Sequence, residues 1–475
     1  MNTFYWYDYE TFGLSPKVQR IAQFAGIRTD ENLNVLDEHM FYCKPTHDSL
    51  PAPEACAVTG ITPQLCEKKG FIEHEFIKKI HDEFSKPGTC IVGYNSIAFD
   101  DEYTRHTLFR NFLDPYSWHW QNGNARWDIL NVARFCYAHK EEGSLNWVKN
   151  ERNRPIFKLD RLAPANHIEH TNAHDAMADV RATIGIARII KETQPKFFNY
   201  ALSLNDKKEV AQLVKPLHPM LLTSSSFGYK SSFTRLVTSI CNHPEYSDRS
   251  IVFNLNQDPE IFLELETEEL KTLTFSRKSD LPKGIEKLDL SELVFNKSPM
   301  FVCSPNSDNF KLSPTLIEKF QLNLDKCLKN LRFIQQNSQS IEDKIRSIYA
   351  NDSDREPSRD VDQSIYDGFI SNNDRQICNE IQNLSPTQLS EFVPEFEDRR
   401  LTKLFLNFKA RNYPQLLNEF EQEQWFEIVQ SRIQSGANGF LSIDSFERSI
   451  ESLRETQPGR EHLWKGLEDY AQSFI

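Results

Sequence analysis

The sequence predicts three successive regions: a mixed α/β region, a small β-rich region and a helical region. Up to about residue 190, strand-like apolar runs alternate with amphipathic helices. From about 200 to 310, short apolar runs are separated by Pro, Asn and Asp in a Ser/Thr-rich context, and helical periodicity then dominates to the end. A chain of 475 residues is long enough for several cores. We therefore expect domains over 1–194, 195–350 and 351–475.

The α/β region contains four elements that its patterns predict. These are a strand over 4–8, an amphipathic helix over 74–84, a buried strand over 89–95 and a long helix over about 173–191. Pro195 cannot continue that last helix, because it lacks the amide hydrogen that a helix interior requires. A domain boundary near residue 195 follows.

The later regions have weaker patterns. The apolar runs 250–255 and 298–303 are typical of short strands, and 314–336 has helical periodicity. The polar stretch 351–363 is typical of a linker. Its acidic spacing resembles a calcium loop, but the turn glycine is missing and Arg355 and Pro357 interrupt it, so an EF-hand is rejected.

Composition limits the class of protein. No apolar run approaches the roughly 18 residues that cross a bilayer, and the first residues lack the features of a signal peptide, so we expect a cytoplasmic protein without membrane contact. Nine cysteines without a Cys-x-x-Cys pair indicate reduced thiols rather than disulfides or structural zinc. The net charge of -13, taken alone, argues against nucleic acid as a partner.

Two carboxylates stand out in the first predicted strand. Alternate side chains of a strand share a face, so Asp8 and Glu10 point the same way and Tyr9 points the other way. Close like charges need a neutralising cation, and oxygen ligands suit Mg²⁺ or Mn²⁺. The alternative is an exposed strand end with two solvated carboxylates, which is the commoner explanation of an isolated Asp-x-Glu.

Further acids occur at the starts of two predicted helices. Asp100 and Asp101 follow a buried strand and a Gly/Asn turn, where either would also serve as a first-turn acid. His174 and Asp179 lie five residues apart in the sequence NAHDAMADV. By itself, His174 would more often be a surface or capping histidine than a catalytic one.

Together these residues resemble the histidine branch of the Asp-Glu-Asp-Asp superfamily of 3′→5′ exonucleases. The order is Asp-x-Glu on a first strand, an Asp about 90 residues later, then His-x-x-x-x-Asp on a helix. VTGITP (58–63), YDGF (366–369) and LFLNFKARN (404–412) extend the resemblance across nearly the whole chain, to the bacterial exonuclease I family of single-strand DNA exonucleases.

The resemblance implies a ribonuclease-H-like exonuclease domain, an SH3-like β-rich domain and an α-helical C-terminal domain. It also implies that Asp8, Glu10, Asp100 and Asp179 hold two Mg²⁺ ions, for which Mn²⁺ can substitute, and that His174 is the general base. Asp100 is preferred to Asp101 because it directly follows Phe99, as in the Phe-Asp motif of the superfamily.

The local charge around residues 103–161 favours a nucleic-acid partner. This segment has ten Lys and Arg against six Asp and Glu, and four of the seven tryptophans. Aromatic and basic residues together suit single strands, whose bases stack on rings while cations follow the phosphates. By correspondence with the family, the expected DNA contacts are Arg105, Tyr116, Trp120, Arg134, Lys158 and Glu10. Trp118, Trp127 and Trp147 are as consistent with core positions as with DNA contacts.

The family implies further properties. They are processive magnesium-dependent release of nucleoside 5′-monophosphates, a role in DNA repair and recombination, a monomeric state, and association with the C-terminal tail of single-stranded DNA-binding protein. Two alternatives stay open: a ribonuclease of the same superfamily, and a binding scaffold with an inactive site. All five catalytic positions are filled, which argues against the scaffold, and the short oligoribonucleases have no equivalent of residues 200–475.

Overall fold

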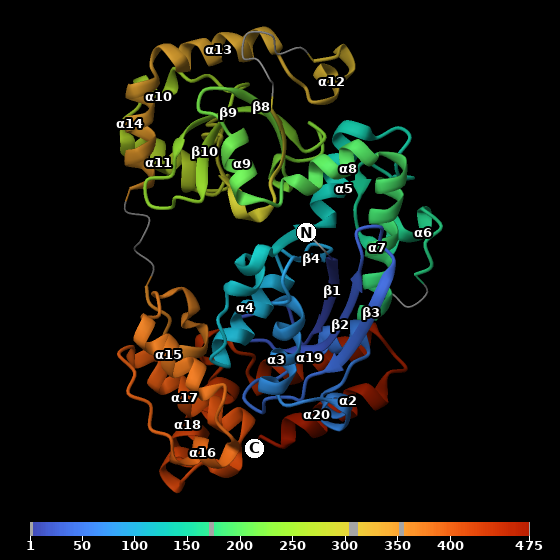
Figure 1. The fold of residues 1–475 in the computed structure, drawn as a ribbon, viewed down its shortest axis with the longest axis vertical. Coiled ribbons are helices and arrows are strands. Elements are labelled where there is room, and N and C mark those ends of the chain that lie inside the picture. Colours follow the sequence, from blue (N-terminus) through green and yellow to red (C-terminus); the bar gives the residue numbers. More distant parts are fainter. Residues whose placement is uncertain (1–2, 171–174, 304–311, 351–355, 475) are drawn as a thin grey trace. The chain divides into compact units, whose positions relative to one another are not determined.

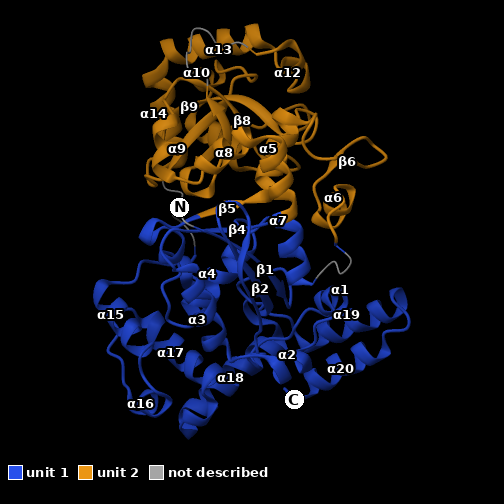
Figure 2. Cartoon of the chain, turned by 45° about the vertical axis from the view of Figure 1, so that its right-hand side comes forward, with its two compact units in different colours: residues 1–125, 170–184, 355–475 blue, residues 126–169, 185–354 orange. Residues whose placement is uncertain are grey.

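The structure is a computed structural model that describes residues 3–170, 175–303, 312–350 and 356–474. The chain divides into two compact units (Figures 1 and 2). The first comprises residues 1–125, 170–184 and 355–475, and the second comprises 126–169 and 185–354. Segments distant in sequence therefore share a unit, and the C-terminal residues belong with the N-terminal ones.

The first unit is built around a mixed sheet with the order β3-β2-β1-β4. Its N-terminal elements are β1 (Thr3–Thr11), β2 (Ile21–Thr29), β3 (Val35–Tyr42), α1 (Pro53–Thr59), α2 (Pro63–Lys69), α3 (Glu73–Phe84), β4 (Thr89–Gly93) and α4 (Asp100–Arg110). Strand β1 runs antiparallel to β2 and parallel to β4. The predicted strands at 4–8 and 89–95 and the helix at 74–84 are thereby confirmed.

The two faces of β1 differ in chemistry. Tyr5, Tyr7 and Tyr9 share one face and pack in a buried cluster with Phe76 and Phe84 of α3. The alternation of the strand directs Asp8 and Glu10 to the opposite face. Packing of the aromatic face thus fixes the register that presents both carboxylates on the other side.

The remaining elements of the first unit are helical. They are α15 (Asn372–Ile381), α16 (Pro386–Glu391), α17 (Arg399–Asn412), α18 (Glu419–Ser435), α19 (Ile443–Thr456) and α20 (Glu461–Gln472), preceded by a 3-10 turn, η6 (Val361–Tyr366). Trp464 and Phe446 pack in one buried cluster with Cys56 and Cys66 of α1 and α2. The predicted helical C-terminal region is confirmed, and its core is continuous with that of the α/β region.

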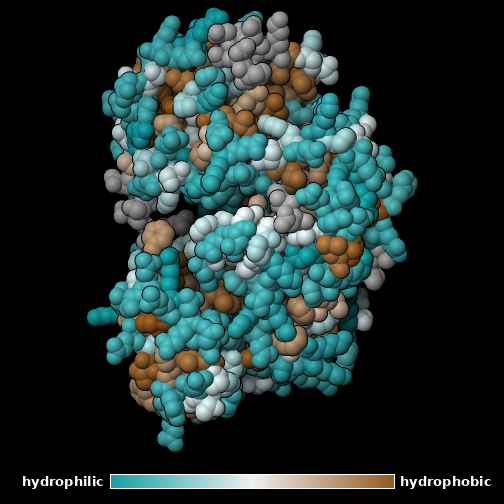
Figure 3. Space-filling model, viewed as in Figure 1, coloured by the Kyte–Doolittle hydropathy of each residue, from teal (hydrophilic) through white to brown (hydrophobic). Residues whose placement is uncertain are grey.

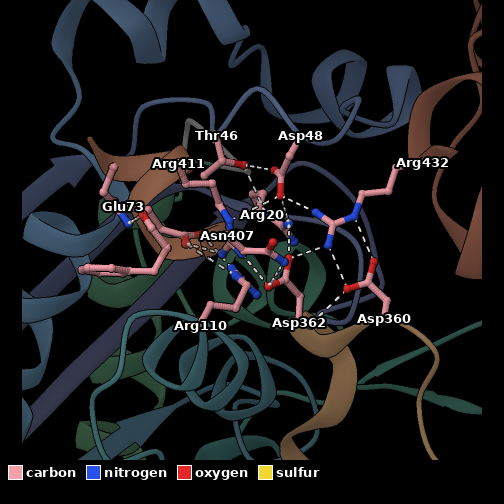
Figure 4. A network of polar contacts seen from close by, with 12 residues as sticks. Arg20, Thr46, Asp48, Glu73, Arg110, Asp360, Asp362, Asn407, Arg411 and Arg432 are labelled. Atoms are coloured by element: carbon pink, nitrogen blue, oxygen red, sulfur yellow. Dashed lines mark hydrogen bonds and ion pairs between the residues drawn. The ribbon is translucent and has the colours of Figure 1, made fainter. Parts of the chain in front are cut away.

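A network of buried ion pairs joins these two parts of the first unit (Figure 4). Asp48 accepts hydrogen bonds from Arg20 at 2.8 Å and from Arg432 at 2.6 Å. Arg432 also donates to Asp360 at 2.8 Å and to Asp362 at 2.7 Å. Burial alone would raise the pKa of the Asp48 carboxyl, but the neighbouring arginines lower it to about 2.

The network corrects the interpretation of 351–363 as a linker. Residues 351–355 lie outside the described residues, but Asp360 and Asp362 are buried and belong to the network. Asp362 also accepts a hydrogen bond from Arg411. A polar composition is typical of a linker only when the charges are solvated, and here arginines distant in sequence bury them.

The second unit contains an antiparallel sheet with the order β11-β10-β9-β8-β12. Its strands are β8 (Pro219–Thr223), β9 (Thr234–Asn242), β10 (Arg249–Asn254), β11 (Leu290–Val294) and β12 (Met300–Cys303), with a small hairpin of β6 (Val148–Lys149) and β7 (Pro155–Ile156) elsewhere. The predicted strands at 250–255 and 298–303 correspond to β10 and β12. The β-rich region is therefore confirmed.

Helices complete the second unit. They are α5 (Ile129–Lys140), α6 (Leu159–Ala165), α8 (Pro195–Ser203), α9 (Lys207–Leu213), α10 (Ile261–Glu264), α11 (Thr267–Phe275), α12 (Pro314–Lys319), α13 (Leu324–Gln336) and α14 (Ser338–Tyr349). The helical pattern at 314–336 is two helices, because the chain turns at 320–323. Strand β5 (Ala125–Asp128) and helix α7 (Ala176–Thr193) each contain residues of both units.

Pro195 has the role that its chemistry predicts. Helix α7 ends at Thr193, and α8 begins at Pro195, where a missing amide hydrogen costs nothing. The start of the helix predicted at 173 lies outside the described residues.

The state of the cysteines and the polarity of the surface agree with what the composition predicts, namely reduced thiols and no apolar run that could cross a bilayer. All nine cysteines are free, and eight of them are buried. The face drawn in Figure 3 is mainly hydrophilic, with hydrophobic groups scattered in small patches. Among the described residues, every helix is too short or too polar to span a membrane.

Candidate active site

The candidate site lies at the carboxyl end of β1. The last residue of β1 that pairs with β4 is Trp6, so Asp8 and Glu10 extend past the end of the parallel ladder. The chain leaves β4 at Gly93 and enters α4 at Asp100. Carboxyl ends of parallel strands meet at one edge of a sheet, where α/β proteins commonly bind ligands.

Gly93 permits the turn that carries the chain from β4 to α4. A Cβ atom at this position would lie 2.5 Å from the Cβ of Ser96 and 3.1 Å from the carbonyl oxygen of Tyr7. Any larger residue would therefore push the turn away from β1. The close approach keeps the first turn of α4 beside the strand that carries Asp8 and Glu10.

Three carboxylates meet in this part of the first unit. Asp8, Glu10 and Asp179 each offer an oxygen, and these oxygens lie within 4.8 Å of one another. Asp179 comes from the first turn of α7, about 170 residues away in sequence. Asp100 is outside this close group, but it is buried, and among the charged neighbours it has the largest effect on the pKa of Asp8.

Burial and neighbouring acids dominate the electrostatics of Asp8 and Glu10. Burial raises the pKa of Asp8 well above its usual range, and repulsion from Asp100, Asp179 and Glu10 raises it further. Burial, followed by Asp179, Asp100 and Asp175, raises the pKa of Glu10 to about 8. Groups with such shifts cluster at functional sites, and a bound cation would remove the repulsion.

Asp100 and Asp101 face different surroundings. The hydroxyl of Tyr7 donates to Asp101 at 2.6 Å, which places the Asp101 carboxylate on the tyrosine face of β1. Asp100 instead acts electrostatically on both Asp8 and Glu10. Of the two acids, Asp100 is the one whose charge raises the pKa of both Asp8 and Glu10.

A second group of possible ligands differs in its charge balance. Asp37, His39 and Glu83 also lie within 4.8 Å of one another. Arg28 contacts both carboxylates, at 3.7 Å from Asp37 and at 3.0 Å from Glu83, and Lys86 lies 2.6 Å from Glu83. These cations already neutralise the acids, so the group has no need of a metal.

Two histidines precede Asp179. His174, the predicted general base, lies outside the described residues. His170 is described, and its Nε2 atom is hydrogen-bonded to the Asp179 carboxylate. Sequence reasoning missed His170, because a spacing of nine residues from Asp179 matches no local pattern.

The expected DNA-contacting residues of the first unit lie near α4. Trp120 is 60% exposed, so its ring is available for stacking. Arg105 is largely buried, donates to Glu102 at 2.8 Å and lies 5.6 Å from the ring of Tyr116. The hydroxyl of Tyr366, from the C-terminal segment, donates to the same Glu102 at 2.5 Å. Basic and aromatic side chains are thus held together by one acid.

The second unit contains Arg134 and Lys158. Arg134 donates to Asn131 at 2.9 Å and lies 5.9 Å from the ring of Phe157. Lys158 is exposed and precedes α6. Trp118 and Trp127 are fully buried core residues, and Trp147 is half-buried, with its indole donating to the carbonyl of Glu141 at 2.9 Å.

Known proteins resemble this chain over nearly its whole length. Family models match at 5–187 (Exonuclease), 205–351 (Exonuclease I SH3-like domain) and 359–474 (Exonuclease I C-terminal domain). The exodeoxyribonuclease I of Escherichia coli is 40% identical over 100% of this chain and 98% of its own length. That of Haemophilus influenzae is 39% identical over 95% and 94%, respectively.

Solved structures agree as well. E. coli exonuclease I in complex with a dA16 oligonucleotide has a TM-score of 0.93 and 36% identity, with all of both chains covered. A moderately thermophilic exonuclease I from Methylocaldum szegediense has a TM-score of 0.92 and 38% identity, also with full coverage. The chain described here matches three family models in order and is 40% identical to a relative over its full length, and it has an acidic cluster at the end of β1. These findings show that the chain belongs to the exonuclease I family.

Proposed function

We propose that the chain removes nucleotides one at a time from the 3′ end of single-stranded DNA, as an exodeoxyribonuclease that releases nucleoside 5′-monophosphates. The observation that carries the proposal is the close group of three carboxylates, Asp8, Glu10 and Asp179, in which burial and repulsion from neighbouring acids, Asp100 first among them, raise the pKa of Asp8. Family membership supports the substrate, because relatives are named exodeoxyribonuclease I and one is solved with a DNA oligonucleotide.

The four carboxylates would hold two Mg²⁺ ions, with Mn²⁺ as a substitute. An all-oxygen donor set suits these ions, and the raised pKa values of Asp8 and Glu10 are the cost of assembling the site without a cation. When bound, two such ions lower the pKa of an attacking water and stabilise the leaving 3′ oxygen.

The protein's own groups would supply positioning and proton transfer. Asp8 and Glu10 are fixed by the register of β1, and Asp179 is fixed by the first turn of α7. His174, which precedes that turn, would accept the proton of the water, since imidazole titrates near neutral pH. Glu10 would also lie beside the terminal nucleotide, which makes it a DNA contact as well as a ligand.

Single-strand binding would use aromatic and basic residues of both units. The exposed ring of Trp120 and the ring of Tyr116 would stack with bases, and Arg105, Arg134 and Lys158 would contact phosphates. We further propose functional domains over 1–194, 195–350 and 351–475, with the last two conferring processivity and selectivity for single strands.

The biological setting follows from the family. We propose a monomeric cytoplasmic enzyme of DNA repair and recombination that associates with the C-terminal tail of single-stranded DNA-binding protein. An acidic, apolar tail requires a basic surface beside an apolar pocket.

The decisive test uses three end-labelled substrates, namely single-stranded DNA, duplex DNA and single-stranded RNA, each incubated with Mg²⁺. We expect shortening of single-stranded DNA from its 3′ end to mononucleotides, with the other two substrates degraded far more slowly. Faster degradation of RNA would favour a ribonuclease of the same superfamily. Tight binding without cleavage of any substrate would favour a scaffold and refute the proposal.

A further inference from the structure

A buried histidine contacts the acidic cluster from outside it. The side chain of His170 is 2% exposed, and its Nε2 atom is hydrogen-bonded to the Asp179 carboxylate, which is 19% exposed. His170 and Asp179 both belong to the short segment 170–184 of the first unit. Burial of a polar ring costs free energy unless the ring is hydrogen-bonded, and here Asp179 is the partner.

His170 differs from the direct ligands in its geometry. The group of atoms within 4.8 Å of one another contains oxygens of Asp8, Glu10 and Asp179, and His170 is not a member. The nitrogen of His170 that faces this group is the one engaged with Asp179. Its influence on the site therefore passes through the Asp179 carboxylate.

The other ring nitrogen indicates how the imidazole is used. Nδ1 of His170 is buried and has no hydrogen-bond partner among the described residues. An unpaired lone pair at that position is less costly than an unpaired N–H, so the arrangement suits an imidazole that carries its hydrogen on Nε2. In that form Nε2 of the ring donates to the Asp179 carboxylate.

A donor at this place restricts the Asp179 carboxylate to one rotamer, which holds its oxygens in constant positions beside Asp8 and Glu10. Carboxylates that bind metals are commonly oriented by such hydrogen bonds from residues that are not ligands themselves.

We propose that His170 is a positioning residue that orients the Asp179 carboxylate for the divalent cation and takes no direct part in hydrolysis. The proposal rests on the metal centre described under the proposed function. It separates the two histidines before α7: His170 acts on metal affinity, whereas His174 acts on proton transfer.

The test measures metal binding without DNA. Mn²⁺ is titrated into the full-length protein, and the free ion is followed by electron paramagnetic resonance. In His170→Leu, the leucine side chain occupies the space of the imidazole but cannot donate a hydrogen bond. In His170→Gln, the side-chain amide can donate a hydrogen bond to the Asp179 carboxylate. We expect His170→Leu to weaken Mn²⁺ binding about 10–100-fold and His170→Gln to restore it to within about threefold of the original protein.

Activity supplies the second readout. At saturating Mn²⁺, the rate of single-stranded DNA degradation by His170→Leu should return to within about tenfold of the original rate, because the reacting groups are intact. His462→Ala, an exposed histidine on α20, is the matched control and should change neither quantity. Circular dichroism establishes that each variant is folded.

Several results would overturn the proposal. Unchanged Mn²⁺ affinity in His170→Leu would show that the contact has no bearing on the metal. Equal loss in His170→Leu and His170→Gln would show that shape, not donation, matters. A rate loss beyond about 100-fold at saturating Mn²⁺ would make His170 part of the chemistry. Failure of the original protein to bind Mn²⁺ would instead refute the metal centre itself.

Discussion

Replacing Glu10 by Gln should stabilise the metal-free protein, in spite of removing a functional group. Glu10 is buried, and its pKa is raised from 4.5 to about 8, first by burial and then by Asp179, Asp100 and Asp175. The native state therefore holds a proton on Glu10 over a range in which the unfolded chain has lost it. Stability must fall as the pH rises from about 4.5 to about 8.

The size of the effect follows from the two pKa values. At pH 7 the unfolded carboxyl is fully ionised, and the native one is mostly protonated, which corresponds to a penalty of about 3 kcal/mol. At pH 5 the same calculation gives a penalty below about 1 kcal/mol. Relaxation of the site and entry of water would reduce both values. Glutamine imitates the protonated form and does not titrate.

Scanning calorimetry in a chelating buffer at pH 5, 6, 7 and 8 measures this difference. Glu10→Gln should unfold at nearly the same temperature as the original protein at pH 5 and at a higher temperature at pH 7 and 8. Adding Mn²⁺ should raise the stability of the original protein more at pH 8 than at pH 5, because protons and the cation compete for the same oxygens.

The control is Glu427→Gln, an exposed acid on α18, which should leave the pH profile unchanged. The reasoning fails if Glu10→Gln destabilises the metal-free protein equally at every pH. It also fails if the difference in stability between Glu10→Gln and the original protein does not grow between pH 5 and pH 8, since that would mean that Glu10 ionises in the native state without cost.

The remaining predictions concern the reaction. Asp8→Ala should abolish hydrolysis while leaving single-strand binding largely intact, and a rate above a tenth of the original would contradict its assignment as a ligand. Asp100→Ala should lower the rate far more than Asp101→Ala. The reverse order would show that Asp101, and not Asp100, is the metal ligand. His174→Ala should lower the rate by about 10²–10⁴-fold and remove the histidine-like rise through pH 6–8, with Mn²⁺ affinity unchanged. Trp120→Ala should weaken single-strand binding by about 1–3 kcal/mol at every salt concentration in a fluorescence titration, whereas a change only in the salt slope would exclude stacking.

Local patterns predicted the acids of β1 well. The alternation of Asp8, Tyr9 and Glu10 predicts two carboxylates on one face, and β1 has that register. The order of the acids along the chain predicted four ligands, and three of them, Asp8, Glu10 and Asp179, form the close group that the structure gathers from β1 and α7. Such predictions succeed because the period of a strand and the spacing within a short motif depend only on residues that are close in sequence.

Long-range partners could not be predicted. Asp360 and Asp362 have the composition of a linker, and only the fold reveals that Arg432 contacts both. His170 lies in a loop whose geometry no periodic pattern describes. The same limit applies to Trp118 and Trp127, since sequence could not decide between a core and a binding surface, and burial did.

The buried ion network has a consequence for the order in which the chain can fold during synthesis. Asp48 is among the first residues made, but its partner Arg432 is added 384 residues later. Removing one partner of a buried pair leaves an uncompensated charge, at a cost of about 3–5 kcal/mol. Arg20 already contacts Asp48 within the α/β part, but the network gains its remaining arginines only when α17 and α18 have been made. A chain that ends before α17 therefore leaves this network without Arg411 and Arg432.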